Sequence, residues 1–197
     1  AYDYDTIIQA MYAGYTSVMY DGSKLKYEEN VRNTQEIVKV AHPLDITVEA
    51  EIGRVGKSEE GDEDFGTILS VPEEVKKFVN DTEIDACAIA IGTQHGMQKQ
   101  EAELDFERLA QIRKLVEVPL VLHGSSGVKD EELEIMGKRG IQKVNIGTRL
   151  KRVFTDKLRQ VLDENKELHN HINALKPSIE AVKEEVIYKM KKLGCKG

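Results

Sequence analysis

The sequence predicts an α/β protein built on a parallel β-sheet, and three observations lead to this fold class. First, short apolar runs rich in residues that favour strands recur along the chain. Second, each run ends in glycine and polar residues, as strands do where they enter a loop. Third, stretches with the apolar spacing of helices separate the runs, and this alternation is typical of βα units.

Five strands are predicted, and they are taken here in chain order. They are TSVMYDGS (16–23), ITVEAEIG (46–53), ACAIAIGTQHG (86–96), PLVLHGSSG (119–127) and QKVNIGT (142–148). Helices are predicted at about 4–13, 28–41, 72–80, 104–116, 130–138, 148–165 and 177–193. The helix at 72–80 is supported by Pro72 near its start and by the acids of its first turn, which the helix dipole favours. The strands end roughly one βα unit apart, except where an acidic, glycine-rich segment follows Glu51, and we expect that segment to be a mobile loop.

Composition limits the functional classes. The chain has 197 residues, 40% of them hydrophobic and 32% charged, which is enough for one domain with a sizeable core. The net charge of −7 argues against nucleic acid as a partner, and no apolar run approaches the roughly 20 residues that span a bilayer. Cys87 and Cys195 form no close motif, and Cys87 lies in an apolar, strand-like run, so we expect a buried free thiol at Cys87 and a reducing, cytoplasmic setting.

Polar side chains follow the predicted strands at the point where each strand ends. They are Asp21, Glu51, His95, His123 and Asn145. Each of them alone is typical of an ordinary turn or of a structural residue. The carboxyl ends of parallel strands meet at one edge, however, and that edge is where α/β folds build their sites. Their common position therefore predicts one shared site.

Two histidines and two carboxylates at one edge indicate a metal. Imidazole and carboxylate ligands without a thiolate suit Zn²⁺ or another borderline divalent ion. A catalytic zinc takes three protein ligands and keeps one position open. His95 and His123 supply two of them, and the spacing alone does not decide whether Glu51 is the third.

The loops HGSSG and NIGT follow the last two strands. Glycine lets the backbone approach a ligand closely, and successive N–H groups can bind a phosphate. In (β/α)₈ barrels, the loops after strands 7 and 8 commonly form the phosphate site. Ordinary strand-to-helix turns are the alternative interpretation of either loop alone.

In this order and spacing, the motifs TSVMYDGS, VEAEIG, AIGTQHG, VPLVLHGSSGV and KVNIGT resemble the class II, zinc-dependent fructose- and tagatose-bisphosphate aldolases. The resemblance covers nearly the whole chain. It implies a TIM (β/α)₈ barrel, of which this chain carries about strands 4 to 8. Residues 1–197 are then a single barrel domain, incomplete at its N-terminus.

The resemblance implies a role for each motif. His95 and His123 would bind the catalytic zinc, and Asp21 and Glu51 would form an alternative position for a second divalent or monovalent cation. Glu59 would be the loop acid that handles a substrate proton. The residues that would bind the dihydroxyacetone phosphate part of the substrate are Gly96, Gly124, Ser125, Ser126, Asn145, Ile146, Gly147 and Thr148.

The implied activity is the reversible aldol cleavage of fructose 1,6-bisphosphate, or of a related ketose phosphate, to dihydroxyacetone phosphate and an aldehyde such as glyceraldehyde 3-phosphate. Zinc would act as a Lewis acid on the ketone, which acidifies the adjacent carbon. The implied protein is a cytoplasmic lyase of glycolysis or carbohydrate metabolism, a homodimer or homotetramer, with a phosphosugar as its small-molecule partner and neither nucleic acid nor membrane.

The chain also departs from the pattern of the family. A strand ending in a His-x-Asp-His-type motif, which supplies a further zinc ligand and the acid/base aspartate, would come before Ala1, so the fragment alone is expected to be inactive. Ser125 stands where the family usually has glycine, Arg149 where it often has an acid, and Ile179 where it often has arginine. The dihydroxyacetone phosphate half of the substrate is thus better supported than the aldehyde.

Two other classes remain open from the sequence. One is a phosphosugar-binding barrel without zinc or catalysis. The other is a TIM barrel of the isomerase or epimerase type that acts on a phosphorylated sugar. Stoichiometric zinc and aldol cleavage would distinguish an aldolase from both.

Overall fold

A computed structural model describes residues 1–57 and 66–195. The main sheet has five strands in the order β1-β2-β4-β6-β7, and every neighbouring pair is parallel. The strands are β1 (Ser17–Tyr20), β2 (Thr47–Ile52), β4 (Ala86–Ile89), β6 (Leu120–Leu122) and β7 (Ile141–Val144). The prediction of five parallel strands in sequential order is confirmed. Within the described residues the sheet is open, with β1 and β7 at its two edges.

The register of the sheet brings the carboxyl ends of the strands to one edge. Ala50 lies opposite Tyr20 on one side and Cys87 on the other. Between β6 and β7 the pairing shifts once, after Leu120. The residues that follow the strands therefore gather at this edge, where parallel α/β folds place their sites.

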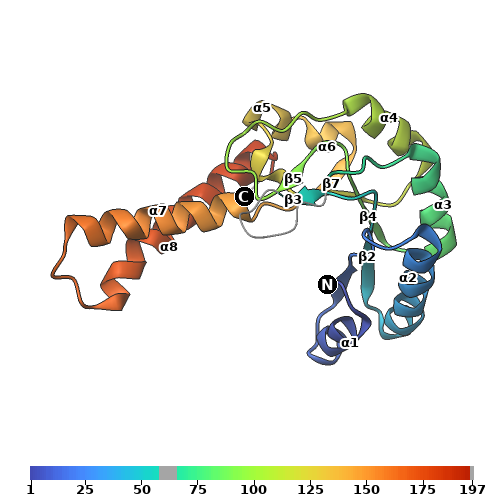
Figure 1. The fold of residues 1–197 in the computed structure, drawn as a ribbon, viewed down its shortest axis with the longest axis horizontal. Helices are drawn as coiled ribbons and strands as arrows, with labels where there is room; N and C mark the ends of the chain where they lie inside the picture. The colour runs from blue at the N-terminus through green and yellow to red at the C-terminus, as the bar shows by residue number, and fades with distance from the viewer. Residues whose placement is uncertain (58–65, 196–197) are drawn as a thin grey trace.

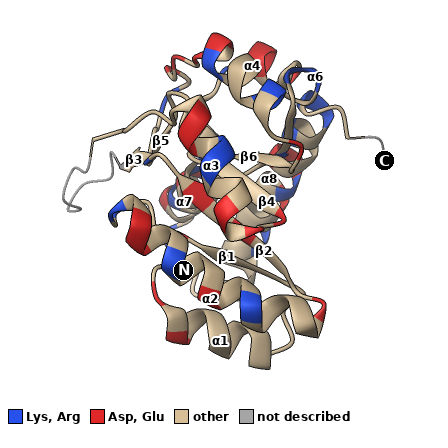
Figure 2. Cartoon of the chain, turned by 90° about the vertical axis from the view of Figure 1, so that its right-hand side faces the viewer, with Lys and Arg blue, Asp and Glu red and all other residues tan. Residues whose placement is uncertain are grey.

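Helices pack along the outer side of the sheet. They are α1 (Tyr4–Tyr12), α2 (Tyr27–Ala41) with the short 3₁₀ turn η1 (His42–Leu44), α3 (Pro72–Thr82) and α4 (Phe106–Leu115). Figure 1 shows α2, α3 and α4 following one another around the sheet, and each packs against the next. The outward faces of α3 and α4 carry charged residues of both signs (Figure 2), as expected of faces turned to water.

Local sequence explains where these helices begin. Asp3 caps α1 by accepting a hydrogen bond from the backbone N–H of Thr6, and Asp105 caps α4 in the same way. Pro72 occupies the start of α3, where a missing N–H costs nothing. Phe78, from α3, is fully buried in the apolar layer between the helices and the sheet.

The helix predicted at 130–138 is in fact two short helices, α5 (Asp130–Leu133) and α6 (Met136–Arg139). The backbone N–H of Ile135 bonds to the carbonyl of Glu132, three residues back, instead of continuing the α-helical pattern. Gly140 then ends α6 in a left-handed conformation.

Two long helices, α7 (Thr148–Glu164) and α8 (His171–Lys192), form a hairpin that projects from the rest of the molecule (Figure 1). α7 contains no buried residue. The predicted start of the last helix at 177 is wrong, because α8 begins six residues earlier and contains Pro177 within it. Asn170 causes the earlier start, since its side chain accepts hydrogen bonds from the backbone N–H groups of Ile172 and Asn173.

The strand predicted at 86–96 is also shorter than expected. β4 ends at Ile89, and a second strand, β5 (Gln94–His95), pairs in parallel with β3 (Gly56–Lys57) in a separate two-stranded sheet. Glu59 and the rest of residues 58–65 in the predicted mobile loop lie outside the described residues. The described ends of that segment are joined, because Arg54 and Ile68 exchange two backbone hydrogen bonds of 2.8 Å.

Cys87 is buried, Cys195 is exposed, and both are free. None of the helices in the described part of the chain is long and apolar enough to cross a membrane.

Candidate functional site

Two glutamates of β2 point to the same side of the sheet, because successive side chains of a strand alternate between its faces. Glu49 is 5% exposed and Glu51 is 1% exposed. Carboxylates are almost never so deeply buried unless they are paired. Their partners should therefore be sought on the neighbouring strands.

His123 follows β6 directly and lies between the two glutamates. Its Nδ1 is 2.8 Å from Glu51 Oε2 and its Nε2 is 2.8 Å from Glu49 Oε1. Burial of the ring favours the neutral form, but the hydrogen bonds and charges of the two carboxylates outweigh it and raise the pKa of His123 to about 9. In this arrangement the ring is held as an imidazolium that donates from both nitrogens.

Lys143, from the edge strand β7, completes this row of charges. Its Nζ lies 2.6 Å from Glu49 Oε2, so each oxygen of Glu49 has its own donor. Burial disfavours the carboxylate form of Glu49, but the hydrogen bonds from His123 and Lys143 outweigh burial and lower the pKa of Glu49. Glu51 in turn accepts a hydrogen bond from the backbone N–H of Val55, at 3.2 Å.

His95 reaches the same edge from β5. The centroids of its ring and of the His123 ring are 6.1 Å apart, with the planes inclined by 48°. Gly124 allows this approach. Its φ is +65°, and a Cβ at this position would lie 2.7 Å from the carbonyl carbon of Gln94, the residue before His95. Only glycine meets both conditions, so this residue brings the two histidine loops together.

The side chains at this edge agree in part with the predicted zinc site. Two imidazoles bound to one zinc at about 2.0–2.1 Å have ring centroids roughly 5–6 Å apart, close to the separation of His95 and His123. A metal at His123 would replace one of the two glutamate hydrogen bonds, and the carboxylate released would remain beside it. The described residues contain no group of three His, Cys, Asp or Glu side chains that could hold an ion. The geometry is therefore compatible with these two histidines as ligands of one ion.

Asp21 lies one residue beyond the end of β1. Its Oδ1 accepts hydrogen bonds from the backbone N–H of Ser23 at 3.1 Å and from the Ser23 hydroxyl at 2.6 Å. The structure thus gives Asp21 a turn-capping contact. Because Tyr20 lies opposite Ala50, Asp21 and Glu51 are the next residues along neighbouring strands.

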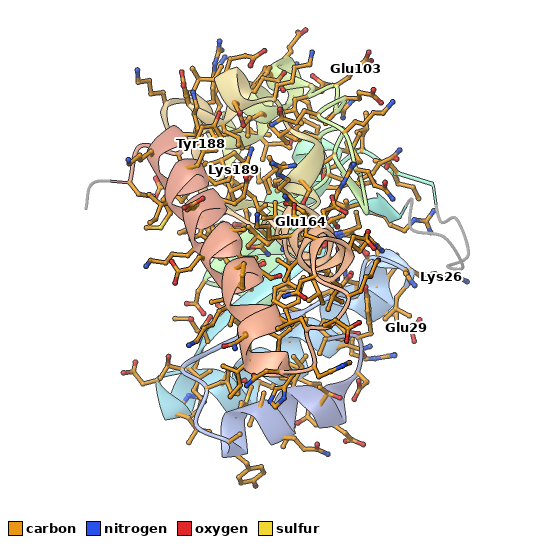
Figure 3. All side chains as sticks on the ribbon, turned by 90° about the vertical axis from the view of Figure 1, so that its left-hand side faces the viewer. Lys26, Glu29, Glu103, Glu164, Tyr188 and Lys189 are labelled. Carbon is orange, nitrogen blue, oxygen red and sulfur yellow. The ribbon has the colours of Figure 1, made fainter. Side chains whose placement is uncertain are left out.

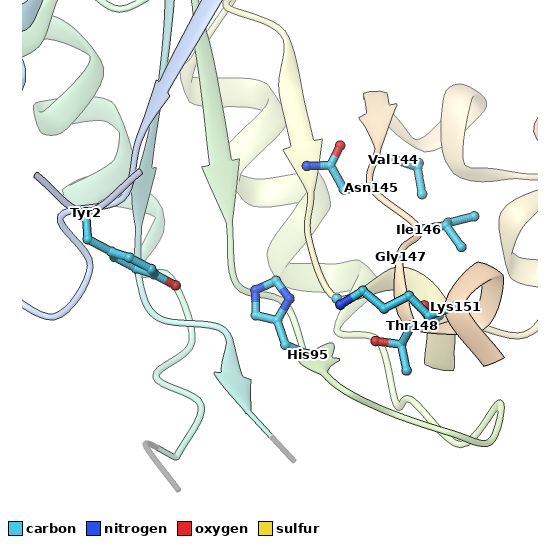
Figure 4. A pocket seen from close by; sticks show the side chains of 10 residues that line it. Tyr2, His95, Val144, Asn145, Ile146, Gly147, Thr148 and Lys151 are labelled. Atoms are coloured by element: carbon cyan, nitrogen blue, oxygen red, sulfur yellow. The ribbon is translucent and has the colours of Figure 1, made fainter. Parts of the chain in front are cut away.

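The two small loops after β6 and β7 meet at one pocket. They line one pocket of about 510 Å³ at the carboxyl edge of the sheet, together with His95 (Figure 4). The loop after β6 contributes Gly124 and Ser126. The loop after β7 contributes Asn145, Ile146, Gly147 and Thr148. Val144, Lys151 and Tyr2 complete the lining.

Two of the predicted substrate residues, Ser125 and Gly96, do not line this pocket. Ser125 is 2% exposed, and its hydroxyl donates to the carbonyl of Leu122 at 3.0 Å, so it braces the short 3₁₀ turn η2 (Ser125–Gly127). Gly96 follows β5 with a φ of +81° and does not line the pocket. Of the two other departures from the family pattern, Arg149 forms two hydrogen bonds with Glu185, at 2.9 and 3.1 Å, and Ile179 is 55% exposed on α8.

Besides Tyr2 and Val144 of the pocket lining, three charged residues of the site were missed by sequence analysis. Glu49 could have been found, because a second acid two positions from Glu51 in a buried strand must share its face. Lys143 carried no such signal, since its partner lies 94 residues away. Lys151 looked like one more surface lysine of an amphipathic helix.

Comparison with known proteins identifies relatives over the whole chain. The family model described as class-II fructose-bisphosphate aldolase matches residues 1–197. The YdjI aldolase of Escherichia coli K12 is 35% identical, with a TM-score of 0.81 over 98% of this chain and 66% of that one. A putative fructose-1,6-bisphosphate aldolase of Coccidioides immitis is 32% identical, with a TM-score of 0.85 over 100% of this chain and 70% of that one.

A third structure, a fructose-bisphosphate aldolase from Campylobacter jejuni, is 20% identical with a TM-score of 0.74, and it supports the fold alone. The match covers 95% of this chain and 64% of that one. The chain thus spans about two thirds of the length of the structures it matches, and it carries the corresponding part of their barrel.

Proposed function

Because the chain belongs to the class II fructose-bisphosphate aldolase family, we propose that the protein containing it is a lyase that cleaves a ketose phosphate, such as fructose 1,6-bisphosphate, into dihydroxyacetone phosphate and an aldehyde. The observation that carries this proposal is the common pocket of His95 and the two glycine-containing loops. It sets an imidazole beside backbone N–H groups suited to a phosphate. The imidazole is suited to hold a metal beside the ketone of the substrate, and the N–H groups are suited to hold its phosphate.

The proposed cofactor is zinc, with His95 and His123 as ligands and with Asp21 and Glu51 near a second cation position. When bound, the ion supplies Lewis-acid chemistry to a ketone. With one ring nitrogen of His123 on the ion, the glutamate at the other nitrogen, Glu49 or Glu51, would keep its hydrogen bond and orient the ring as a ligand.

The phosphate end of the substrate is proposed to bind at the two loops. The first N–H groups of α7 have no partner within the helix, and the dipole of the helix places partial positive charge there. Glu59 is proposed to move the substrate proton, by its resemblance to the loop acid of the family. Ser125 would support this region by bracing the turn that carries Gly124 and Ser126, and Gly96 is proposed to contact the substrate by its resemblance to the family alone.

We further propose that residues 1–197 belong to one barrel domain, completed by strands outside this chain. A homodimer or homotetramer is also proposed, because the α7–α8 hairpin presents apolar side chains that another subunit could cover. Its exposed apolar side chains include Leu162, Ile172, Ile179, Ile187 and Met190. The free thiols of Cys87 and Cys195 support a cytoplasmic location, and the activity would serve glycolysis or another branch of carbohydrate metabolism.

The test uses the complete gene product. Zinc content is measured by atomic absorption, and cleavage of fructose 1,6-bisphosphate and of tagatose 1,6-bisphosphate by coupled assay. We expect about one bound zinc per chain, lost in His95→Ala and His123→Ala, and cleavage of at least one ketose bisphosphate. Binding of phosphosugars without zinc or cleavage would reject the aldolase and favour a binding protein. Interconversion of sugars without cleavage would favour an isomerase.

A further inference from the structure

His123 has two ring nitrogens, and each of them already meets a carboxylate in this structure. Nδ1 lies 2.8 Å from Glu51 Oε2, and Nε2 lies 2.8 Å from Glu49 Oε1. A ring nitrogen that binds a metal gives up its carboxylate, whereas the other nitrogen keeps its own. The surroundings of the two glutamates differ, and the difference indicates which of them stays with the ring.

The two glutamates lie at different depths in the sheet. Both belong to β2, and Glu49 comes two residues before Glu51, so it lies about 6–7 Å farther from the carboxyl edge. His95 and the pocket of the two loops lie at that edge. Nδ1 of His123, which meets the outer glutamate, is therefore the nitrogen on the side of the pocket. Nε2 meets the inner glutamate and is directed away from the edge.

Contacts also fix Glu49 more firmly than Glu51. One oxygen of Glu49 bonds to the ring of His123, and Lys143 Nζ lies 2.6 Å from the other. Lys143 belongs to β7, so this carboxylate is held from two further strands of the sheet. The second oxygen of Glu51 accepts from the backbone N–H of Val55 at 3.2 Å. Glu51 is thus the carboxylate with the weaker second contact, and it lies nearer the edge.

We propose that Glu49 is the carboxylate that holds His123 when the protein carries its metal, and that Lys143 is a positioning residue that acts through Glu49. The inference rests on the proposed function and deepens it, because it assigns Nδ1 to the ion and the N–H of Nε2 to Glu49. Such a hydrogen bond fixes the tautomer and the direction of a histidine ligand. Lys143 does not line the pocket, so its effect on the site runs through Glu49.

Zinc affinity tests the inference independently of turnover. Competition with a chromophoric chelator gives the Kd of the complete gene product and of Glu49→Leu, Lys143→Met and Lys143→Arg, each shown to be folded by circular dichroism. We expect Glu49→Leu and Lys143→Met to weaken zinc binding roughly 10- to 100-fold, as loss of the outer partner of a histidine ligand does, and Lys143→Arg to recover most of it. Lys143→Met should cause little further loss in the Glu49→Leu protein, because the lysine acts through the glutamate.

Lys189→Met is the matched control. Lys189 Nζ lies 2.6 Å from Asp130 Oδ1, the same distance as in the pair of Lys143 and Glu49, and neither Lys189 nor Asp130 lines the pocket of the two loops. The control variant therefore loses a similar ion pair outside the site, and its zinc affinity should be unchanged. An equal loss of zinc affinity in Lys189→Met would show that metal binding follows general stability, and it would overturn the inference.

The ring nitrogens of His123 give a second measurement, which a merely structural role of Lys143 and Glu49 would not move. In zinc-loaded protein with isotope-labelled histidine, long-range nitrogen–proton correlation spectra distinguish Nδ1 from Nε2. The signals that are absent from His123→Asn belong to His123. We expect zinc on Nδ1 and the proton on Nε2 in the wild type.

Zinc on Nε2 would overturn the inference, and so would wild-type zinc affinity in either Glu49→Leu or Lys143→Met. Additive losses in the double variant would overturn the action of Lys143 through Glu49, and a wild-type protein that binds no zinc would overturn the whole inference. Cleavage of ketose phosphates is scored separately by coupled assay. Zinc binding that depends on Glu49 and Lys143 in a protein without cleavage would support the inference and reject only the proposed reaction.

Discussion

Lys143 Nζ lies 2.6 Å from Glu49 Oε2, and the other oxygen of this carboxylate is 2.8 Å from His123 Nε2. The lysine is about half exposed at the edge of the sheet, whereas the glutamate is buried beneath it. The half-exposed Lys143 thereby fixes the carboxylate of Glu49, which in turn holds the ring of His123. This relationship connects the stability of the sheet edge with the geometry of the pocket.

Replacement of Lys143 by methionine should lower the free energy of unfolding by about 1–3 kcal/mol, because Glu49 remains buried with one partner lost. Urea denaturation of the gene product measures this change. Lys143→Arg, which keeps the charge, is the matched control and should recover most of the loss. An unchanged midpoint in Lys143→Met would show that solvent replaces the lysine without cost.

The pKa of His123 predicts how the protein depends on pH when a chelator keeps it free of metal. The folded value of about 9 lies above the ordinary value of 6.5. The stabilisation by Glu49 and Glu51 is therefore fully present below pH 6.5 and is lost as pH rises through about 9. Melting temperatures from pH 6 to 10 should fall across this window in the wild type and much less in His123→Asn. Parallel curves for the two proteins would contradict the assignment.

Addition of one methyl group at Gly124 should separate the two histidine loops. In Gly124→Ala, the new Cβ would lie 2.7 Å from the backbone of Gln94, and the φ of +65° disfavours any L side chain. We expect a loss of about 1–3 kcal/mol in stability, together with weaker zinc and phosphate binding. Gly137→Ala is the control, because a Cβ there meets nothing within 4 Å. Equal stability of both variants, measured by urea denaturation, would argue against the close contact.

Asp130 anchors the C-terminal part of α8, where Figure 3 labels Tyr188 and Lys189. Its carboxylate accepts hydrogen bonds of 2.6 Å from both of these residues. Burial acts to raise the pKa of Asp130, but the hydrogen bonds from Lys189, Tyr188 and Gln100 outweigh it and lower the value to about 2.

This contribution is present above pH 3.8 and is lost as pH falls through about 2, because the folded pKa is the lower one. Asp130→Asn should destabilise the protein at pH 7 by about 1–3 kcal/mol, since Lys189 is only 7% exposed. The difference between wild type and variant should shrink as the buffer is taken from pH 5 to pH 2. A difference that stays constant over this range, in urea denaturation, would reject the ion pair as its source.

The order of the strands could be predicted from sequence because each βα unit carries its own signals. The apolar run, the glycine and the helix that follows are local, as in the unit that ends at His123. The meeting of the two small loops followed from the same rule, since parallel strands share one edge.

What could not be predicted depends on contacts between distant segments. His95 looked like the end of a long strand, yet β4 stops at Ile89 and a second small sheet brings His95 forward. Lys143, which bonds to Glu49, comes from the edge strand β7, and no local sequence pattern predicts this contact. Pro177 looked like a helix start, whereas the stronger signal was the cap at Asn170.

Gly124 also limits how the pocket can diversify. Any side chain at this position meets the backbone of Gln94, so substitution of Gly124 is disfavoured whichever ligand the pocket binds. Ser126 and Lys151 carry no such restriction, because their side chains face the pocket or solvent. A laboratory library intended to change which ligand the pocket binds would therefore hold Gly124 constant and vary those two positions.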